Sequence, residues 1–172
     1  MDEYVIMTAV VEDEVMLCDM FLEHITANTE YISHGEIQMG VGEGDFVEGK
    51  LVARPSSNAR HFWMKYIHGN ITSTEDSGVF KAVGPDGDIL GFCVVEIQED
   101  GAEPYGMLCD LLVKGGSRSK GVGSALLKAG LEWFAQKGIS DIYLESGLNN
   151  HSAHEYFIHK GFVKVSEIYK LA

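Results

Sequence analysis

The chain has 172 residues, 45% of them apolar and 10% aromatic, and its 13 basic and 26 acidic residues give a formal net charge of −13. This composition excludes a disordered chain and predicts one compact α/β domain over residues 1–172. The negative charge argues against nucleic-acid binding, since phosphate neutralisation needs a basic surface, and it favours a cationic partner.

Targeting and redox signals are also missing from the sequence. No apolar run approaches the roughly 18 residues of a membrane span, and the N-terminus has no basic, signal-like region. The three cysteines show no CxxC spacing, which argues against a disulfide framework or a thiolate zinc site. We therefore expect a cytoplasmic protein with no membrane association.

The first third of the chain mixes clear and unclear signals. A short β-favouring run, Tyr4–Thr8, precedes an amphipathic helix over Glu12–Thr26. Residues 28–57 are rich in acids and glycines and keep no sustained period, so we expect an irregular acidic segment that is functional or contains a short element. A helix over Ala59–His68, ended by Gly69, should follow.

The remainder of the chain alternates strands and helices. Three consecutive β-rich runs joined by short turns predict an antiparallel meander. A helix, a strand, a second helix and a last strand should complete the sheet. In chain order, these elements are expected at Val79–Val83, Ile89–Gln98, Tyr105–Val113, Lys120–Lys137, Asp141–Glu145, His151–Lys160 and Phe162–Leu171.

A glycine-rich loop joins the third meander strand to the following helix. Residues 118–123 read R-x-x-G-x-G, and five bases face a single acid over residues 114–137. A helix start offers free N–H groups and partial positive charge, so this loop is a candidate pyrophosphate cradle. It matches neither the P-loop nor the dinucleotide fingerprint, and a plain strand-to-helix connection is the structural alternative.

A second motif lies about 30 residues further on, where residues 150–162 read N-x-x-A-x-x-Y-F-x-x-x-G-F. The two motifs in this order resemble the GNAT superfamily of acyl-CoA-dependent N-acyltransferases. The resemblance covers residues 78–172 well and 1–27 loosely, and it does not cover 28–57. It implies the GNAT fold, a mixed and mostly antiparallel twisted sheet of six to seven strands flanked by about four helices.

The resemblance implies an acetyl-CoA site and a direct transfer of acetyl to an amine in a ternary complex. The strand should splay at its junction with the loop, so that a backbone N–H near Leu112 meets the thioester carbonyl. The residues implied to bind acetyl-CoA are Leu112, Val113, Arg118, Ser119, Lys120, Gly121, Val122, Gly123, Ser124, Asn150 and Phe157.

Asp110 is the candidate catalytic acid beside the amine, because a carboxylate on an apolar strand is costly without a partner. Similar Asp-Leu-x-Val segments occur in polyamine-type members of the family. A solvated Asp110 is the alternative. Glu36 and Glu145 are further acceptor-binding candidates, and Glu96 is a weaker one; each could instead point to solvent. The resemblance also implies that residues 28–57, which carry Glu36, border the acceptor side, and we expect this glycine-rich segment to act as a lid over the acceptor site; a solvated acidic loop or a dimer contact is the alternative.

The departure from the family pattern is Phe157, which stands where the family's tyrosine general acid is expected. Tyr156 is adjacent, but neighbouring helix positions differ by about 100°, so we expect it in the core with its hydroxyl satisfied unless the register shifts. Tyr156 is therefore retained as a second catalytic candidate.

The sequence also bears on a metal, on the acceptor and on the oligomeric state. The seven histidines form no set that resembles a metal site, so no metal is expected. The acceptor could be a small molecule or a protein amine, preferably a small cationic one, and a homodimer through the last strand is a further expectation. The alternative function, favoured by Phe157, is a CoA-binding regulatory or interaction module with weak catalysis.

Overall fold

The computed structural model describes residues 4–118 and 120–171. Its strands are β1 (Val5–Thr8), β2 (Gly42–Val47), β3 (Lys50–Pro55), β4 (Ser77–Val83), β5 (Ile89–Gln98), β6 (Tyr105–Val113) and β7 (Ile142–Leu144). Its α-helices are α1 (Glu14–Ala27), α2 (His34–Gln38), α3 (Ala59–Thr72), α4 (Val122–Gln136) and α5 (His151–His159), and short 3₁₀ turns are η1 (Val11–Asp13), η2 (Thr29–Tyr31) and η3 (Gly115–Ser117).

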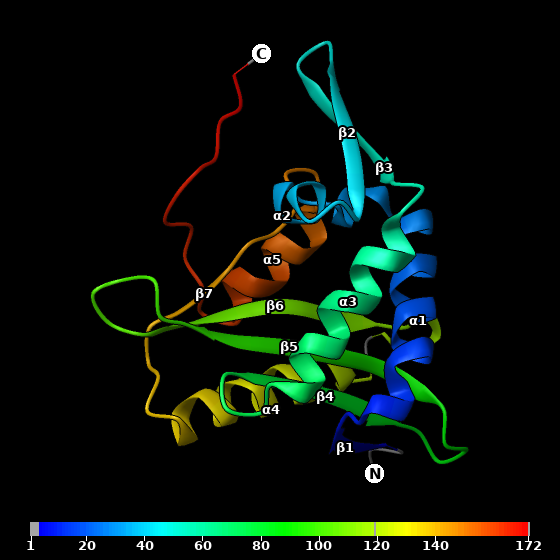
Figure 1. The fold of residues 1–172 in the computed structure, drawn as a ribbon, viewed down its shortest axis with the longest axis vertical. Helices are drawn as coiled ribbons and strands as arrows, with labels where there is room; N and C mark the ends of the chain where they lie inside the picture. Colours follow the sequence, from blue (N-terminus) through cyan, green and yellow to red (C-terminus); the bar gives the residue numbers. More distant parts are fainter. Residues whose placement is uncertain (1–3, 119, 172) are drawn as a thin grey trace.

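The strands form a five-stranded sheet, in the order β1-β4-β5-β6-β7, and a separate β2–β3 hairpin (Figure 1). All neighbours are antiparallel except β6 and β7, which run parallel. The predicted mixed, mostly antiparallel fold and its β4–β5–β6 meander are therefore confirmed.

Two apolar clusters hold the layers together. Helices α1 and α3 cover one face, where Phe21 and Trp63 stack with ring centroids 4.6 Å apart, and α4 covers the other, where Phe134 is fully buried. The buried positions of α1 recur at three- and four-residue spacing, as expected for one apolar stripe. Each large side chain removed from water contributes on the order of 2 kcal/mol, so these stripes orient the helices.

The register of β6 against β5 shifts by one residue at Cys109. Val94 pairs with Asp110 and Val95 with Leu108, which leaves Cys109 as an extra residue on β6. Such a bulge interrupts the alternation of side chains between the two faces. As a result, Leu108 packs on the α4 side whereas Asp110 and Leu112 face α1 and α3.

The structure changes two expectations about residues 28–72. Residues 28–57 contain η2, α2 and the β2–β3 hairpin, so the alternative of short elements within this segment is confirmed and the expectation of an irregular segment is wrong. Helix α3 continues through Gly69 to Thr72, because the buried Ile67 and Asn70 keep its last turn on the core and outweigh the roughly 1 kcal/mol cost of one glycine.

The expected last strand over Phe162–Leu171 is also absent from the described chain. This segment runs away from the sheet beside the body of the molecule (Figure 1), and it pairs with no strand of the described chain. The pattern alone cannot form a strand, because a strand needs a neighbour for its backbone hydrogen bonds.

Candidate active site

The site is organised around the carboxylate of Asp110. This residue is only 5% exposed, so the alternative of a solvated Asp110 is wrong. Its Oδ1 accepts a hydrogen bond from the Tyr31 hydroxyl at 3.1 Å, and its Oδ2 accepts one from the Tyr66 hydroxyl at 2.7 Å. The expected partner for this costly carboxylate is thus a pair of tyrosines from η2 and α3.

The pKa of Asp110 is raised to about 7. Burial is the main cause, and the negative charges of Glu36 and Glu96 add to it, while the hydrogen bonds from Tyr66 and Tyr31 work in the opposite direction. Asp110 can therefore gain or lose a proton near neutral pH, as a group that exchanges protons with an amine must.

Beside Asp110, the edge of β6 is left open. Strand β7 pairs with Gly106, Met107 and Leu108 only, and no strand in residues 4–118 and 120–171 pairs with the outer edge of β6 beyond Leu108. The two parallel strands thus part where the bulge begins. The free edge includes Leu112 and Val113, the residues expected at the thioester.

The start of α4 lies at the end of this opening. Gly121 occupies the N-cap position with φ of 81°, a left-handed conformation that favours glycine, and it has no side chain to cover the first N–H groups of the helix. A Cβ at Gly123 would lie 3.4 Å from Val113 and 3.6 Å from the Tyr156 hydroxyl, so this turn packs closely on β6 and α5. An uncapped helix start of this shape fits an anionic phosphate group.

The other residues predicted for acetyl-CoA have mixed environments. Arg118 and Lys120 are exposed, whereas the side chain of Val122 is buried under the sheet and leaves only its backbone for a ligand. Ser124 lies in the first turn of α4, and Ser119 lies outside the described residues. Asn150 precedes α5 and accepts a 3.4 Å hydrogen bond from Ser152 rather than capping the helix N–H groups.

Tyr156 and Phe157 differ from expectation. Phe157 packs against Phe162 with ring centroids 5.7 Å apart. The expectation that the Tyr156 hydroxyl is satisfied is wrong, because its buried oxygen meets no partner at hydrogen-bonding geometry among the described residues. Burial raises the pKa of Tyr156, and the adjacent Ser124 partly offsets the rise. Tyr156, not Phe157, thus places a hydroxyl beside the first turn of α4.

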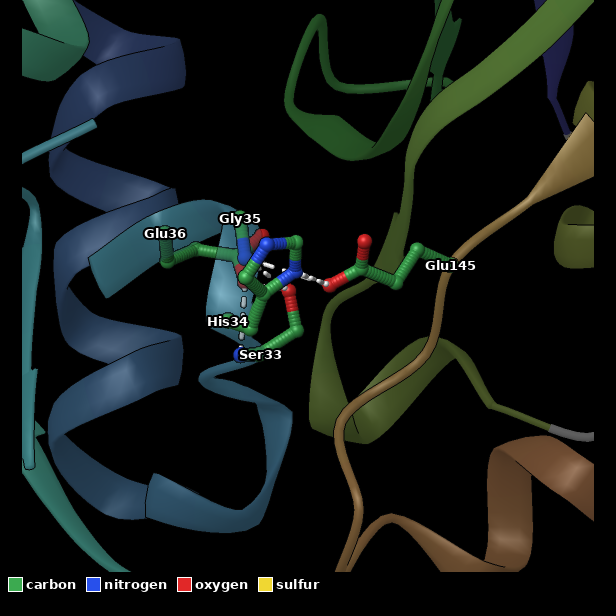
Figure 2. A network of polar contacts seen from close by, with 5 residues as sticks. All are labelled: Ser33, His34, Gly35, Glu36 and Glu145. Atoms are coloured by element: carbon green, nitrogen blue, oxygen red, sulfur yellow. Dashed lines mark hydrogen bonds and ion pairs between the residues drawn. The ribbon is translucent and has the colours of Figure 1, made fainter. Parts of the chain in front are cut away.

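Glu145 and Glu36 tie the segment 28–57 to the sheet. Figure 2 shows Glu145, just after β7, reaching the start of α2, where its Oε1 lies 2.9 Å from His34 Nδ1 and 3.1 Å from the Gly35 nitrogen. Burial acts to raise the pKa of Glu145, but these hydrogen bonds outweigh it and the net pKa is lowered. Glu36 accepts from the Ser33 backbone nitrogen at 2.6 Å and from its hydroxyl, in a capping box.

Gly147 fixes the same contact from the other side. A Cβ at this glycine would lie 2.4 Å from the Glu30 carbonyl oxygen, so the chain after β7 passes directly against η2. Asn149 donates to the Leu51 carbonyl at 3.0 Å, which adds the β3 strand to the attachment. The segment 28–57 is thus held against the chain after β7, and its Tyr31 reaches Asp110.

Sequence reasoning missed Tyr31 and Tyr66. Tyr66 lies on the apolar stripe of its helix, and a tyrosine on such a stripe signals only that its hydroxyl needs some buried partner. Tyr31 falls in the aperiodic segment, where no spacing marks it. Among the described residues no cluster of three or more His, Cys, Asp or Glu side chains is placed to hold a metal ion.

The comparisons with known proteins agree with this geometry. The model of the acetyltransferase (GNAT) family matches residues 48–162. The chain is 30% identical over 108 residues to the aminoglycoside N(6′)-acetyltransferase type 1 of Klebsiella aerogenes, an alignment that covers 60% of this chain and 70% of that one. The chain therefore belongs to the GNAT family of acetyltransferases and is an N-acetyltransferase by class.

Solved structures share the fold at low identity. A Bacillus halodurans protein, solved as a tetramutant, has a TM-score of 0.70 at 15% identity, with 98% of this chain and 99% of that chain covered. The aminoglycoside 6′-N-acetyltransferase AAC(6′)-Ih of Acinetobacter baumannii has a TM-score of 0.64 at 13% identity, with 98% and 97% covered. No helix in the described residues is long and apolar enough to cross a membrane.

Proposed function

We propose that this enzyme transfers acetyl from acetyl-CoA to a primary amine of a small cationic acceptor, in a ternary complex. The observation that carries the proposal is the position of Asp110, a buried carboxylate held by Tyr31 and Tyr66 at the point where β6 and β7 part. We expect residues 28–57 to cover the acceptor side of the site. An amine that enters beside this segment would meet the Asp110 carboxylate next to the free edge of β6.

The donor side of the site suits coenzyme A. Acetyl-CoA supplies an activated acetyl thioester and an anionic pyrophosphate. The backbone N–H groups from Gly121 to Ser124 would hold the pyrophosphate, with Arg118 and Lys120 as exposed cations nearby. Lys114 donates its backbone N–H to Leu90 on β5, so in this antiparallel pair Leu112 also turns its N–H toward β5 and Val113 turns its N–H to the free edge. The oxyanion donor for the thioester carbonyl oxygen is therefore the backbone N–H of Val113 rather than that of Leu112.

Proton transfer on the acceptor side falls to Asp110. The neutral amine nitrogen attacks the carbonyl carbon, a C–N bond forms, the C–S bond breaks, and the thiolate leaves. The amine must lose a proton, and Asp110 can take it directly or through the Tyr66 hydroxyl, because its pKa is near 7. Holding both reactants in one opening supplies much of the remaining rate acceleration.

The leaving thiolate needs a proton donor, for which Tyr156 is our candidate. Its hydroxyl is buried beside the first turn of α4 and meets no other partner among the described residues. Phe157 carries no proton to donate. Water is the alternative donor.

The acceptor class follows from charge and from relatives. The net charge of −13 and the carboxylates around the site favour a cation. Two relatives carry names that state an aminoglycoside acceptor, the Klebsiella aerogenes and Acinetobacter baumannii enzymes. We therefore place small polycationic amines, aminoglycosides among them, ahead of protein amines.

The decisive experiment measures thiol release from acetyl-CoA with a panel of cationic amines, together with the mass of the product. Turnover that depends on an amine, with the product heavier by one acetyl group, would support the proposal. The second candidate function, a CoA-binding module with weak catalysis, rests on Phe157. Calorimetric binding of CoA without turnover on any amine would favour that module and overturn the enzyme proposal.

We also propose a homodimer and a cytoplasmic location, the compartment in which acetyl-CoA is available. The dimer rests on the C-terminal segment, where Val163, Tyr169 and Leu171 are 78%, 84% and 95% exposed. A second copy could cover these side chains and provide the missing strand pairing. Light scattering of the eluting protein should give twice the chain mass, and a monomer at all concentrations would contradict the dimer.

A further inference from the structure

A cavity of about 430 Å³ lies next to the site, between α3 and the ends of β4 and β5. Its walls include Lys65, Tyr66, Asn70, Ser77 and Glu96, of which Lys65 is exposed. Tyr66 is shared with the site already described, because its hydroxyl donates to Asp110 at 2.7 Å. The cavity and the buried carboxylate are therefore neighbours that meet at Tyr66.

The sheet sets the distance between the cavity and the Asp110 carboxylate. Asp110 pairs with Val94 on β5, and Glu96 is two residues further along the same strand, on the same face. A strand rises about 3.4 Å per residue, so Glu96 lies about 7 Å along the strand from the position of Asp110. Its charge acts over this distance, since Glu96 contributes to the raised pKa of both Asp110 and Tyr66.

The walls of the cavity offer an acceptor for a hydrogen-bond donor. Asn70 is only 6% exposed, and its amide nitrogen donates to the Tyr66 carbonyl at 3.1 Å, but its Oδ1 meets no partner among the described residues. Glu96 accepts one hydrogen bond, from Gln98 at 2.9 Å, and keeps further capacity on its carboxylate. The Asn70 oxygen is itself shielded from solvent, so the carboxylate of Glu96 is the acceptor that a ligand in the cavity can reach.

We propose that this cavity binds a second ammonium group of the acceptor, with Glu96 as the specificity-determining residue. The inference rests on the proposed function, in which the reacting amine lies at Asp110. A flexible acceptor whose two amines are separated by about four carbons spans the distance from Asp110 to Glu96. The enzyme thus selects diamines and polyamines over monoamines of the same length. Lys65 also lines the cavity and opposes a cation there, but its side chain is exposed and can turn into solvent.

The test compares diaminobutane with aminobutanol, which replaces one amine by a hydroxyl on the same chain. We measure kcat/KM for each and take their ratio as the preference for the second amine. In Glu96→Gln the ratio should fall about tenfold, the effect of losing one charge-assisted hydrogen bond. In Lys65→Met the ratio should rise, because the opposing charge is gone. Glu99→Gln, an exposed carboxylate just after β5, is the matched control and should leave the ratio unchanged.

Calorimetry of diaminobutane with the wild-type chain and Glu96→Gln gives a second readout that needs no turnover. If amines release thiol but the ratio is the same in wild type, Glu96→Gln and Glu99→Gln, the second-ammonium site is wrong and the acetyltransferase proposal stands. If no amine releases thiol yet diaminobutane binds and Glu96→Gln weakens that binding, the cavity assignment stands and the proposed function fails. If the ratio of the two kcat/KM values falls equally in Glu96→Gln and Glu99→Gln, the preference comes from the overall negative potential of the protein, and the inference is overturned.

Discussion

Tyr66 donates its hydroxyl hydrogen to Asp110 across 44 positions of sequence, at 2.7 Å. The bond joins the middle of α3 to the bulged part of β6, and Tyr31 approaches the same carboxylate from η2. Three separate segments thus converge on one ionisable group, whose pKa decides how the site behaves with pH.

The first prediction concerns catalysis. Asp110 must be ionised to accept a proton, so kcat/KM of the wild type should rise as pH increases through about 7. In Asp110→Asn this rise of kcat/KM with pH should disappear. The value of kcat/KM should also fall by at least about 100-fold, a typical effect of losing a general base. A pH–rate profile that keeps its limb in the Asn variant would assign the limb to another group.

The second prediction concerns stability. The native pKa of Asp110 is about 7, above the roughly 3.9 of an unfolded Asp, so the native state retains a proton that the unfolded chain has lost between these values. The free energy of unfolding should therefore decrease as pH rises from 4 to 7, by an amount on the order of 4 kcal/mol from this group. Urea unfolding of the wild type and Asp110→Asn at both ends of the range isolates this contribution, and parallel curves would contradict it.

The third prediction concerns the effect of the Glu36 charge on the pKa of Asp110. The charge of Glu36 raises the pKa of Asp110, so Glu36→Gln should shift the acid limb of kcat/KM to lower pH. It should also weaken the use of a cationic amine if Glu36 contacts the acceptor, as we expect from the sequence. Glu12→Gln, on the turn before α1, is the control, and identical small effects in both variants would remove Glu36 from the site.

The fourth prediction tests the donor loop. Gly121 has φ of 81°, so Gly121→Asn should fold better than Gly121→Ala, because Asn tolerates the left-handed region. Gly121→Asp places a negative charge beside the expected pyrophosphate and should weaken CoA binding much more than the isosteric Asn. Calorimetry with CoA measures all three, and equal affinities for Asn and Asp would mean that phosphate binds elsewhere.

The fifth prediction separates the two aromatic candidates on α5. Tyr156→Phe removes a buried hydroxyl that has no partner among the described residues, so stability should be kept. If Tyr156 protonates the thiolate, its kcat should fall by about 100-fold or more. Phe157→Tyr should leave kcat unchanged or raise it. A stable Tyr156→Phe with full kcat would assign proton transfer to water.

Local sequence was sufficient where one segment carries its own signal. The helices show their apolar stripes, the meander shows strands joined by short turns, and the R-x-x-G-x-G loop places a helix start after β6. Each of these signals is contained within one short segment of the chain. Burial of one face is a short-range property, so periodicity reports it directly.

The sequence failed where pairing decides the outcome. Phe162–Leu171 has a strand-like pattern but no strand pairing in the described chain. Residues 28–57 fold into η2, α2 and a hairpin, whose contacts with Gly147, Glu145 and Asn149 respectively come from about 100 residues later. Backbone hydrogen bonds between distant segments leave no period in either one.

The orientation of Asp110 shows the same limit at the site itself. The sequence identified an acid in an apolar strand and implied that it needs a partner. Strict alternation would put Asp110 on the same face as Leu108, under α4. Only the bulge at Cys109, set by the register of β5 against β6, turns the carboxylate toward Tyr31 and Tyr66, because one unpaired residue reverses the alternation of everything that follows it.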